Sequence, residues 1–271
     1  MKIEELKKFD EMQNYMDKVD LLDNILEKEG FEYEKRVGNN NLQNITYSSR
    51  GSNIVTSFVV SSQIDGLVLP VILDKDLYDE FFSDGSLISI KTGGGDDKRL
   101  IPVKGGRVYV NTQLHRAALN LPKGCGIQVD HCTHYTGCAL REELRPCTSR
   151  ENAMNKPMRS ILLGNNSFKT KATLTNDEIN KFKDMGFTYL KKGYLVSPKY
   201  NTEKEMYDAI KTIETMLFGE FRYNPLFDFT ETWYALILWK MLDLPEEDIM
   251  AYQRDYIIRN KPDIAKYYCV A

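Results

Sequence analysis

Long apolar runs are missing from this sequence. None of its 271 residues lies in an uninterrupted hydrophobic stretch that approaches the about 18 residues needed to cross a bilayer as a helix. The first residues, MKIEELKKFDEMQ, mix charged and apolar side chains, whereas a secretory signal has a continuous apolar centre. These absences predict an intracellular, cytoplasmic protein without a membrane anchor.

Internal repeats and low-complexity segments are also missing. Hydrophobic residues make up 42% of the chain and charged residues 28%, which is ordinary for a globular protein and argues against long disordered segments. The length allows one large core or two smaller ones.

Cysteine is scarce, and its five copies form an odd set in a chain without an export signal, so reduced thiols are expected. Four of them cluster near the middle of the chain, but no two are as close as the Cys-x-x-Cys pairs of zinc sites. The spacing therefore favours small buried thiols over structural zinc. The five are Cys125, Cys132, Cys138, Cys147 and Cys269.

Charge is distributed unevenly along the chain. The formal net charge is −3, yet residues 101–171 contain eleven Lys or Arg against four Asp or Glu. A basic segment of this kind suits a local phosphate-binding surface, because affinity for nucleic acid follows the charge of the contacting face. An ordinary solvated surface of mixed charge is an equally good interpretation of the count alone.

Hydrophobic periodicity predicts an α+β fold. Residues 2–29 have apolar side chains at steps of three or four and predict an amphipathic helix that ends at Gly30, packed on the body of the protein or forming a dimer seam. Strands are expected next, then a short helix, a hairpin around the glycines of GGGDD, and a second short helix. The strands lie at 44–49, 53–62 and 66–73, the helices at 74–82 and 112–119, and the hairpin strands at 86–92 and 98–104.

The C-terminal part is predicted to be mostly helical. Helices are expected at 228–244, capped by Asp228 or Thr230, and at 245–260, with Pro245 in the first turn. The aromatic residues of the first helix, Trp233, Tyr234 and Trp239, are expected in the core. We therefore divide the chain into an N-terminal helix (1–30), a β-rich domain (31–110), a central ββα domain (111–171), a segment at 172–224 and a helical extension (225–271).

The stretch VDHCTHYTGCALREELRPCTSREN, residues 129–152, carries the chemistry. It predicts a strand ending at His131, a second short strand, and a helix capped by Thr148 or Ser149. A ββα hairpin of this kind brings Asp130 and Asn152 close together, where their oxygen atoms suit one Mg²⁺ or Mn²⁺ ion. A neutral His131 beside them could take a proton from a water that attacks phosphorus.

The segments LHRAAL, LPKG, VDH, LRPCTSREN and NK, between residues 114 and 156, resemble the HNH (ββα-metal) endonucleases of phages and mobile introns. The resemblance implies a central ββα-metal motif with Asp130 and Asn152 as metal ligands, His131 as general base and double-stranded DNA as substrate. His115 is interpreted as structural. The expected DNA contacts are His134, Arg141, Arg145, Arg150 and Lys156, and covering the hairpin is the alternative role for His134.

A second stretch, residues 199–224, resembles the helical half of an AP2-type DNA-binding domain. In that family three strands precede the helix and read the DNA. Only residues 187–196 are expected to be available for them here, which is too short for three strands, so a remnant that keeps the helix for packing is expected.

The central motif departs from the HNH pattern. The loop at 132–142 has none of the asparagines usual in that family, and Glu143 takes the place of an asparagine that braces the general base. A glutamate there could accept a hydrogen bond from the imidazole of His131 and assist catalysis, and it could also raise the pKa of that histidine.

Two hypotheses follow. The first is an active Mg²⁺-dependent HNH endonuclease. The second is a catalytically silent HNH- and AP2-like protein of phage origin that binds DNA, or binds a host defence nuclease, for example of CRISPR type, as an inhibitor. Its N-terminal and C-terminal helices would then be the surfaces for a protein partner or for a second copy.

Overall fold

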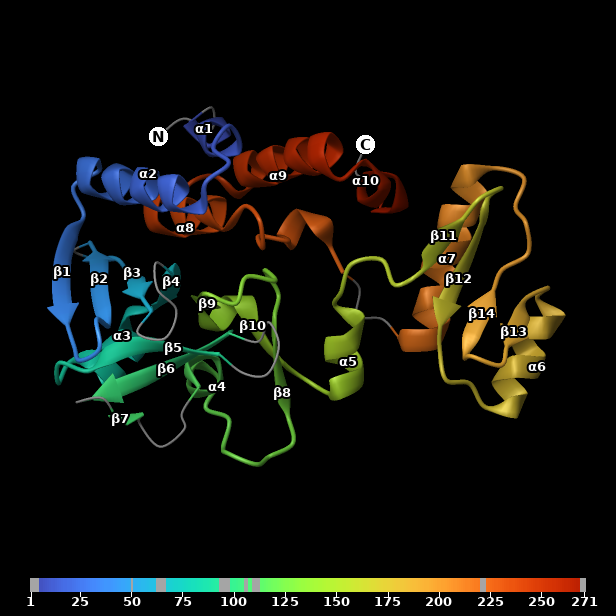
Figure 1. Cartoon of the computed structure of the whole chain (residues 1–271), viewed down its shortest axis with the longest axis horizontal. Helices are drawn as coiled ribbons and strands as arrows, with labels where there is room; N and C mark the ends of the chain where they lie inside the picture. Colours follow the sequence, from blue (N-terminus) through green and yellow to red (C-terminus); the bar gives the residue numbers. More distant parts are fainter. Residues whose placement is uncertain are drawn as a thin grey trace. The chain divides into compact units, whose positions relative to one another are not determined.

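The computed structural model describes residues 5–49, 51–61, 67–92, 98–104, 107–108, 113–219 and 223–268, without the side chains of 92, 98–104, 107–108, 150 and 153. The chain forms two compact units (Figure 1). The first contains residues 1–147 and 227–253, and the second contains residues 148–226 and 254–271. Helices and antiparallel sheets occur in both units, which confirms the α+β class.

A five-stranded sheet of order β1-β2-β3-β4-β9 forms the centre of the first unit. Its first four strands pair antiparallel, and β9 joins β4 in parallel. The strands are β1 (Glu32–Val37), β2 (Gln43–Ser48), β3 (Ile54–Val60), β4 (Val68–Asp74) and β9 (Cys138–Ala139). Strands β3 and β4 are buried at five successive positions each, which explains their continuous apolar sequence.

The remaining strands of the first unit form two smaller sheets. Strands β5 (Leu87–Thr92) and β6 (Lys98–Lys104) make the predicted antiparallel pair, which β7 (Arg107–Val108) extends. The glycine turn expected between β5 and β6, at 93–97, lies outside the described residues. The other sheet is the hairpin of β8 (Gln128–His131) and β10 (Leu144–Cys147). Short helices α3 (Lys75–Phe82) and α4 (Leu114–Ala118) lie at the predicted places.

The N-terminal segment was predicted as one helix but forms two, α1 (Lys7–Asp10) and α2 (Tyr15–Lys28). Asn14 interrupts the helix because its backbone is extended and its side chain accepts a hydrogen bond from the N–H of Met16 at 2.9 Å, which caps α2. Both helices bury their apolar faces in the core of the first unit, through Leu6, Phe9, Val19, Leu22 and Leu26. Of the two predictions for this segment, packing on the body of the protein and a dimer seam, the described structure corresponds to the first.

Helix α8 (Trp233–Leu242) returns from the C-terminal part of the chain to the middle of the first unit. It packs against β3 and α2 (Figure 1). Trp233, Tyr234 and Trp239 are buried, as predicted. The cap prediction was wrong, because the helix begins after Thr232 and the Asp228 side chain accepts from the N–H of Thr230 in the preceding turn.

The second unit is a four-stranded antiparallel sheet covered by helices. The sheet has the order β11-β12-β14-β13 and a core of its own with α7, which includes Phe168, Leu195 and Ile210. Its elements are α5 (Ser149–Met154), β11 (Ile161–Leu163), β12 (Ser167–Lys171), α6 (Asn176–Asp184), β13 (Thr188–Leu190), β14 (Tyr194–Val196), α7 (Glu203–Phe218) and α10 (Pro262–Tyr268), with the end of α9 (Glu246–Asn260).

This sheet corrects the expectation that too few strands precede α7. Strands β11 and β12 were not recognised, since they are three and five residues long. Helix α6 separates β12 from β13, and β14 lies between those two strands in the sheet.

The two units also differ from the predicted five-part division. The segments at 1–30 and 31–110 share one core, and residues 225–271 contribute to both units. Within the described part of the chain, no helix combines the length and apolarity required to cross a bilayer.

Candidate functional site

The hairpin of β8 and β10 holds the residues that carry the HNH resemblance. Its antiparallel register places Asp130 opposite Arg145 and His131 opposite Leu144. Helix α5 follows directly after β10. Thr148 is its N-cap in a reciprocal capping box with Glu151, the two hydrogen bonds being 2.6 and 3.2 Å long.

Asp130 is buried and bound to a guanidinium. The Nε and one terminal nitrogen of Arg145 donate to its Oδ2 atom at 2.8 and 2.6 Å. The expected metal ligand is therefore a member of a charge-assisted cross-strand pair. The Arg145 side chain is 30% exposed besides binding Asp130, and its predicted DNA contact stays a prediction.

His131 has a polar atom without a partner. Its Nε2 atom is buried and makes no hydrogen bond to any residue that the structure describes. Its ring meets that of His115 edge to face, with 5.4 Å between the centroids. Burial, with a smaller effect of the nearby His134, lowers the pKa of His131 to about 4, because a charged imidazole is poorly solvated there. His131 is therefore neutral at pH 7, as a proton acceptor must be.

Glu143 does not brace this imidazole. Its carboxylate is buried and pairs with the ammonium of Lys240, on α8, at 2.7 Å. The catalytic role of Glu143 stays a prediction, whereas the pKa of His131 is lowered and not raised. Sequence reasoning missed Lys240, because the two residues lie far apart in the chain and nothing local signals the pair.

The loop between the two strands, which lacks the usual asparagines, is packed into the first unit. Tyr135 is buried, donates from its hydroxyl to the carbonyl of Pro70 at 2.5 Å, and stacks near Trp233. Gly137 approaches β4 so closely that a Cβ atom would lie 2.6 Å from the same carbonyl oxygen. The loop then forms β9 and so supports the hairpin through the central sheet.

Arg141 is also used internally. Its guanidinium pairs with Asp74 at 3.4 Å and with Asp76 at 2.7 Å, and its Nε donates to the carbonyl of Ala118 at 3.0 Å. These bonds join α3 and α4 to the end of the loop, and the predicted DNA contact of Arg141 stays a prediction. His134 has a left-handed backbone, with φ of 59°, and its carbonyl accepts from Thr230 at 3.3 Å.

The other predicted site residues belong to the second unit. Asn152 lies in α5, and Lys156 is exposed just after that helix. The side chain of Arg150 lies outside the described part of the structure. Asp130 thus belongs to the first unit and Asn152 to the second.

Among the described residues, no group of three or more His, Cys, Asp or Glu side chains could hold a metal ion. The predicted site instead consists of one carboxylate and one amide. The donor types of Asp130 and Asn152 fit Mg²⁺, but Arg145 holds one oxygen of Asp130 and would have to share or release it.

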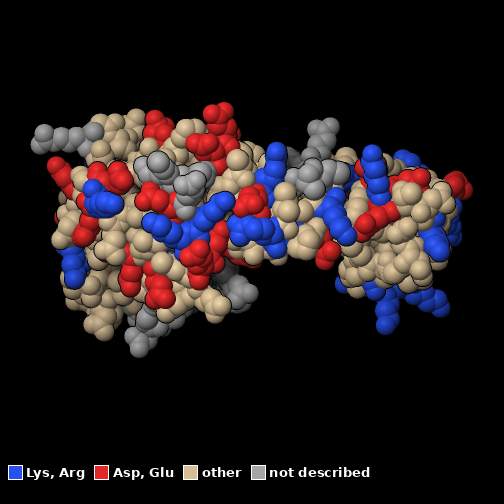
Figure 2. All heavy atoms as spheres, turned by 90° about the horizontal axis from the view of Figure 1, so that it is seen from above, with Lys and Arg blue, Asp and Glu red and all other residues tan. Residues whose placement is uncertain are grey.

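The charges divide between the two units. The residues of the second unit include seventeen Lys or Arg and eleven Asp or Glu, whereas those of the first include nineteen and twenty-eight. The face drawn in Figure 2 carries both signs interspersed and shows no single continuous basic surface. Comparison of the chain with family models, curated proteins and solved structures found no match.

Proposed function

We propose that this protein is a metal-dependent HNH-type endonuclease that hydrolyses phosphodiester bonds in DNA. The observation that carries the proposal is the buried, unpartnered Nε2 atom of a neutral His131 at the end of β8. An imidazole nitrogen without a hydrogen bond is costly to bury. A water or substrate group that donates to it would remove that cost.

In this proposal His131 accepts the proton of the attacking water at Nε2. Its low pKa keeps it neutral over the whole physiological range, but also makes it a weaker base than one with a pKa near 7. Mg²⁺, when bound by Asp130 and Asn152, would supply charge stabilisation at the phosphate. Helix α5, which follows β10 directly and is fixed by its capping box, holds Asn152.

Cutting of supercoiled plasmid and of a linear duplex in Mg²⁺ or Mn²⁺ tests the proposal. We expect metal-dependent products that EDTA abolishes, and His131→Ala should lower the cutting activity at least about 100-fold. Lys183→Gln, an exposed change on α6, is the matched control and should cut normally. Activity that survives His131→Ala would contradict the proposal.

A catalytically silent binding protein is the second candidate, and the pair between Arg145 and Asp130 favours it. In this case the guanidinium occupies the position of the metal cation and neutralises the carboxylate permanently. The protein would then act through binding to DNA or to a protein partner such as a host defence nuclease.

Calorimetry with Mn²⁺ separates the two candidates. The nuclease proposal requires wild-type protein to bind the ion and Asp130→Asn to lose it. If wild-type protein binds none and Arg145→Gln gains binding, the guanidinium has replaced the metal and the silent alternative holds.

A further inference from the structure

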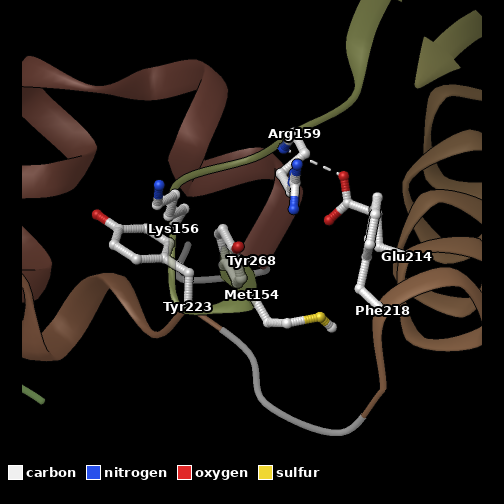
Figure 3. A pocket seen from close by; sticks show the side chains of 7 residues that line it. All are labelled: Met154, Lys156, Arg159, Glu214, Phe218, Tyr223 and Tyr268. Carbon is white, nitrogen blue, oxygen red and sulfur yellow. Dashed lines mark hydrogen bonds between the residues drawn. The ribbon is translucent and has the colours of Figure 1, made fainter. Parts of the chain in front are cut away.

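The hollow of the second unit drawn in Figure 3 is too small for any ligand larger than water. It has room for about one water molecule. Tyr223 on its wall is buried, and an oxygen of Glu214 already accepts from the backbone N–H of Arg159 at 3.1 Å (Figure 3). The exposed surface of the first unit carries a stronger feature.

That feature is a pair of apolar side chains on β1. In the described part of the chain, Val37 and Tyr33 are the most exposed large hydrophobic residues, at 65% and 58%. They lie four positions apart on one strand, so they share one face of the sheet. Scattered apolar side chains at a surface are ordinary, but two on the same face of one strand form a short apolar row.

Strand β1 is an open edge of the central sheet. It is first in the order β1-β2-β3-β4-β9, and β2 is its partner among the described strands (Figure 1). All six of its residues pair with β2 in an unbroken register, from Glu32 to Val37. The strand therefore has no bulge, and it contains no proline, although both devices commonly protect edges from further pairing. Its outward N–H and C=O groups suit another strand.

The charges of β1 complement those of a second, antiparallel copy of the same strand. When a two-fold axis passes through Lys35, residues at equal distances from it stand opposite one another on the same face. Glu34 then faces Arg36 of the second copy, and Tyr33 faces its Val37. Charges on an edge usually repel other strands, but here both opposed pairs are favourable.

The charged pair is already ordered in the single chain. The Nε and a terminal nitrogen of Arg36 donate to the two carboxylate oxygens of Glu34, each at 2.8 Å. The same guanidinium also donates to the carbonyls of Phe82 and Ser86, which fix its position. Glu34 remains exposed. Two such pairs side by side would alternate in sign across the axis, which favours this register over its neighbours.

Lys35 opposes this arrangement, because it would face its own copy across the axis. Like charges directly opposite one another weaken a strand pair. The side chain is exposed and long, so its ammonium can turn toward the ring of Tyr33 in the second copy, its diagonal neighbour. Lys35 therefore makes the association weaker without preventing it.

We infer that β1 is a self-association edge. A second copy of this chain adds its β1 antiparallel about a two-fold axis at Lys35, and the two central sheets become one continuous sheet. An interface of one strand pair is small, so the dimer dissociates in the micromolar range. The inference does not depend on cleavage, since no hairpin residue takes part in it.

Sedimentation velocity of the full chain, between roughly 1 and 200 μM, tests this inference in the expected range of dissociation. We expect a concentration-dependent dimer. Val37→Lys should weaken it at least about tenfold, because the apolar contact is lost and a charge is added beside Lys35. Lys35→Thr should strengthen it, because the like-charge contact disappears. Ile161→Lys, at a 50% exposed position of the edge strand β11, is the matched control and should change nothing.

Crosslinking locates the axis. In a Cys125→Ser background, which removes an exposed thiol, Lys35→Cys should give a covalent dimer with a short bifunctional maleimide, and the background alone should not. Thermal unfolding of each variant verifies that it is folded. A chain that stays monomeric at every concentration, an equal loss with Ile161→Lys, a weaker dimer with Lys35→Thr, or the absence of a crosslink at position 35 would each overturn the inference.

Discussion

Asp130 and Glu143 use their carboxylates in ion pairs inside the first unit, where the HNH resemblance implies catalysis. Each pair forms with a basic residue on another segment, Arg145 on β10 and Lys240 on α8. The side chains of Glu143 and Lys240 are 12% and 13% exposed. Removal of one member would leave the other charge poorly solvated, because the site offers little water.

We therefore expect Lys240→Ala to lower the free energy of unfolding by about 3 kcal/mol. The double variant Glu143→Gln with Lys240→Met should lose less than the two single changes added together, since the one carboxylate left without Lys240, Glu142, is 61% exposed to water. Urea denaturation of the set measures this. Lys28→Ala, at an exposed position of α2, should stay within about 0.5 kcal/mol of wild type, and an additive double variant would contradict the coupling.

Cys125 is the reactive thiol among the four described cysteines. It is exposed, and the N–H of Ile127 and the guanidinium of Arg116, 3.1 Å from its sulfur, lower its pKa below the usual value. Burial instead raises the pKa of Cys138 to about 12. Because the thiolate is the nucleophile, iodoacetamide should modify Cys125 first, and its rate should rise with pH at a lower midpoint than that of a free cysteine.

Mass spectrometry of the alkylated peptides, taken across a pH series, checks this expectation. Arg116→Gln should move the midpoint for Cys125 to higher pH. Faster labelling of Cys138 than of Cys125 in folded protein would be incompatible with the described structure.

At the level of elements, local signals in the sequence located most of the helices and strands. The apolar periodicity of the N-terminal segment continues across Asn14, so it did not indicate that this residue caps a second helix. Strands β11 and β12 were too short to show a hydrophobic pattern. The packing of the loop at 132–142 into the first unit was not predicted. It depends on contacts with Pro70 and Trp233, which are distant in the chain, and no local sequence pattern indicates such contacts.

The partners of the site residues were hidden for the same reason. The sequence located Asp130 and His131 on a strand and Thr148 at a helix start, because those features are local. That Arg141 binds Asp74 and Asp76, and Glu143 binds Lys240, depends on how α3 and α8 pack against the first unit.

The hydrogen-bonded group of Asp10, Tyr234 and Tyr252 joins α1 to α8 and α9. One oxygen of Asp10 accepts from Tyr234 at 2.7 Å and from Tyr252 at 2.6 Å, and the two hydroxyls are 2.7 Å apart. We expect Asp10→Ala to destabilise the protein by about 2 kcal/mol, because two buried hydroxyls lose a charged acceptor.

Thermal and urea denaturation measure the effect, with the exposed Asp20→Ala of α2 as the matched control. Equal stabilities of the two variants would mean that this group does not anchor α1.

At the scale of the whole molecule, the two units carry opposite net charges. Phosphate contacts are therefore expected mainly in the second unit, where Lys169 lies over the ring of Tyr194 at 5.2 Å. Neutralising four lysines of that unit should weaken DNA binding and flatten its dependence on salt, because fewer counterions are released. The four are Lys169, Lys171, Lys191 and Lys192.

The matched set changes four lysines of the first unit, Lys7, Lys8, Lys18 and Lys28, to glutamine. Fluorescence anisotropy with a labelled duplex at several salt concentrations compares the two sets. Equal losses would show that binding follows the net charge of the chain and not the charge of one unit.

Helix α8 packs against β3 and α2, although all of residues 148–226 separate it in sequence from these and the other N-terminal elements of that core. During synthesis the ribosome therefore delivers the N-terminal 147 residues long before the helix that completes their core. Helix α10 of the second unit is likewise made after all of residues 148–226. Neither unit can complete its core before these later helices have left the ribosome, so each core is finished late in relation to its first segment. Such distant contacts also make folding slow, and the nascent first unit is a natural substrate for chaperones.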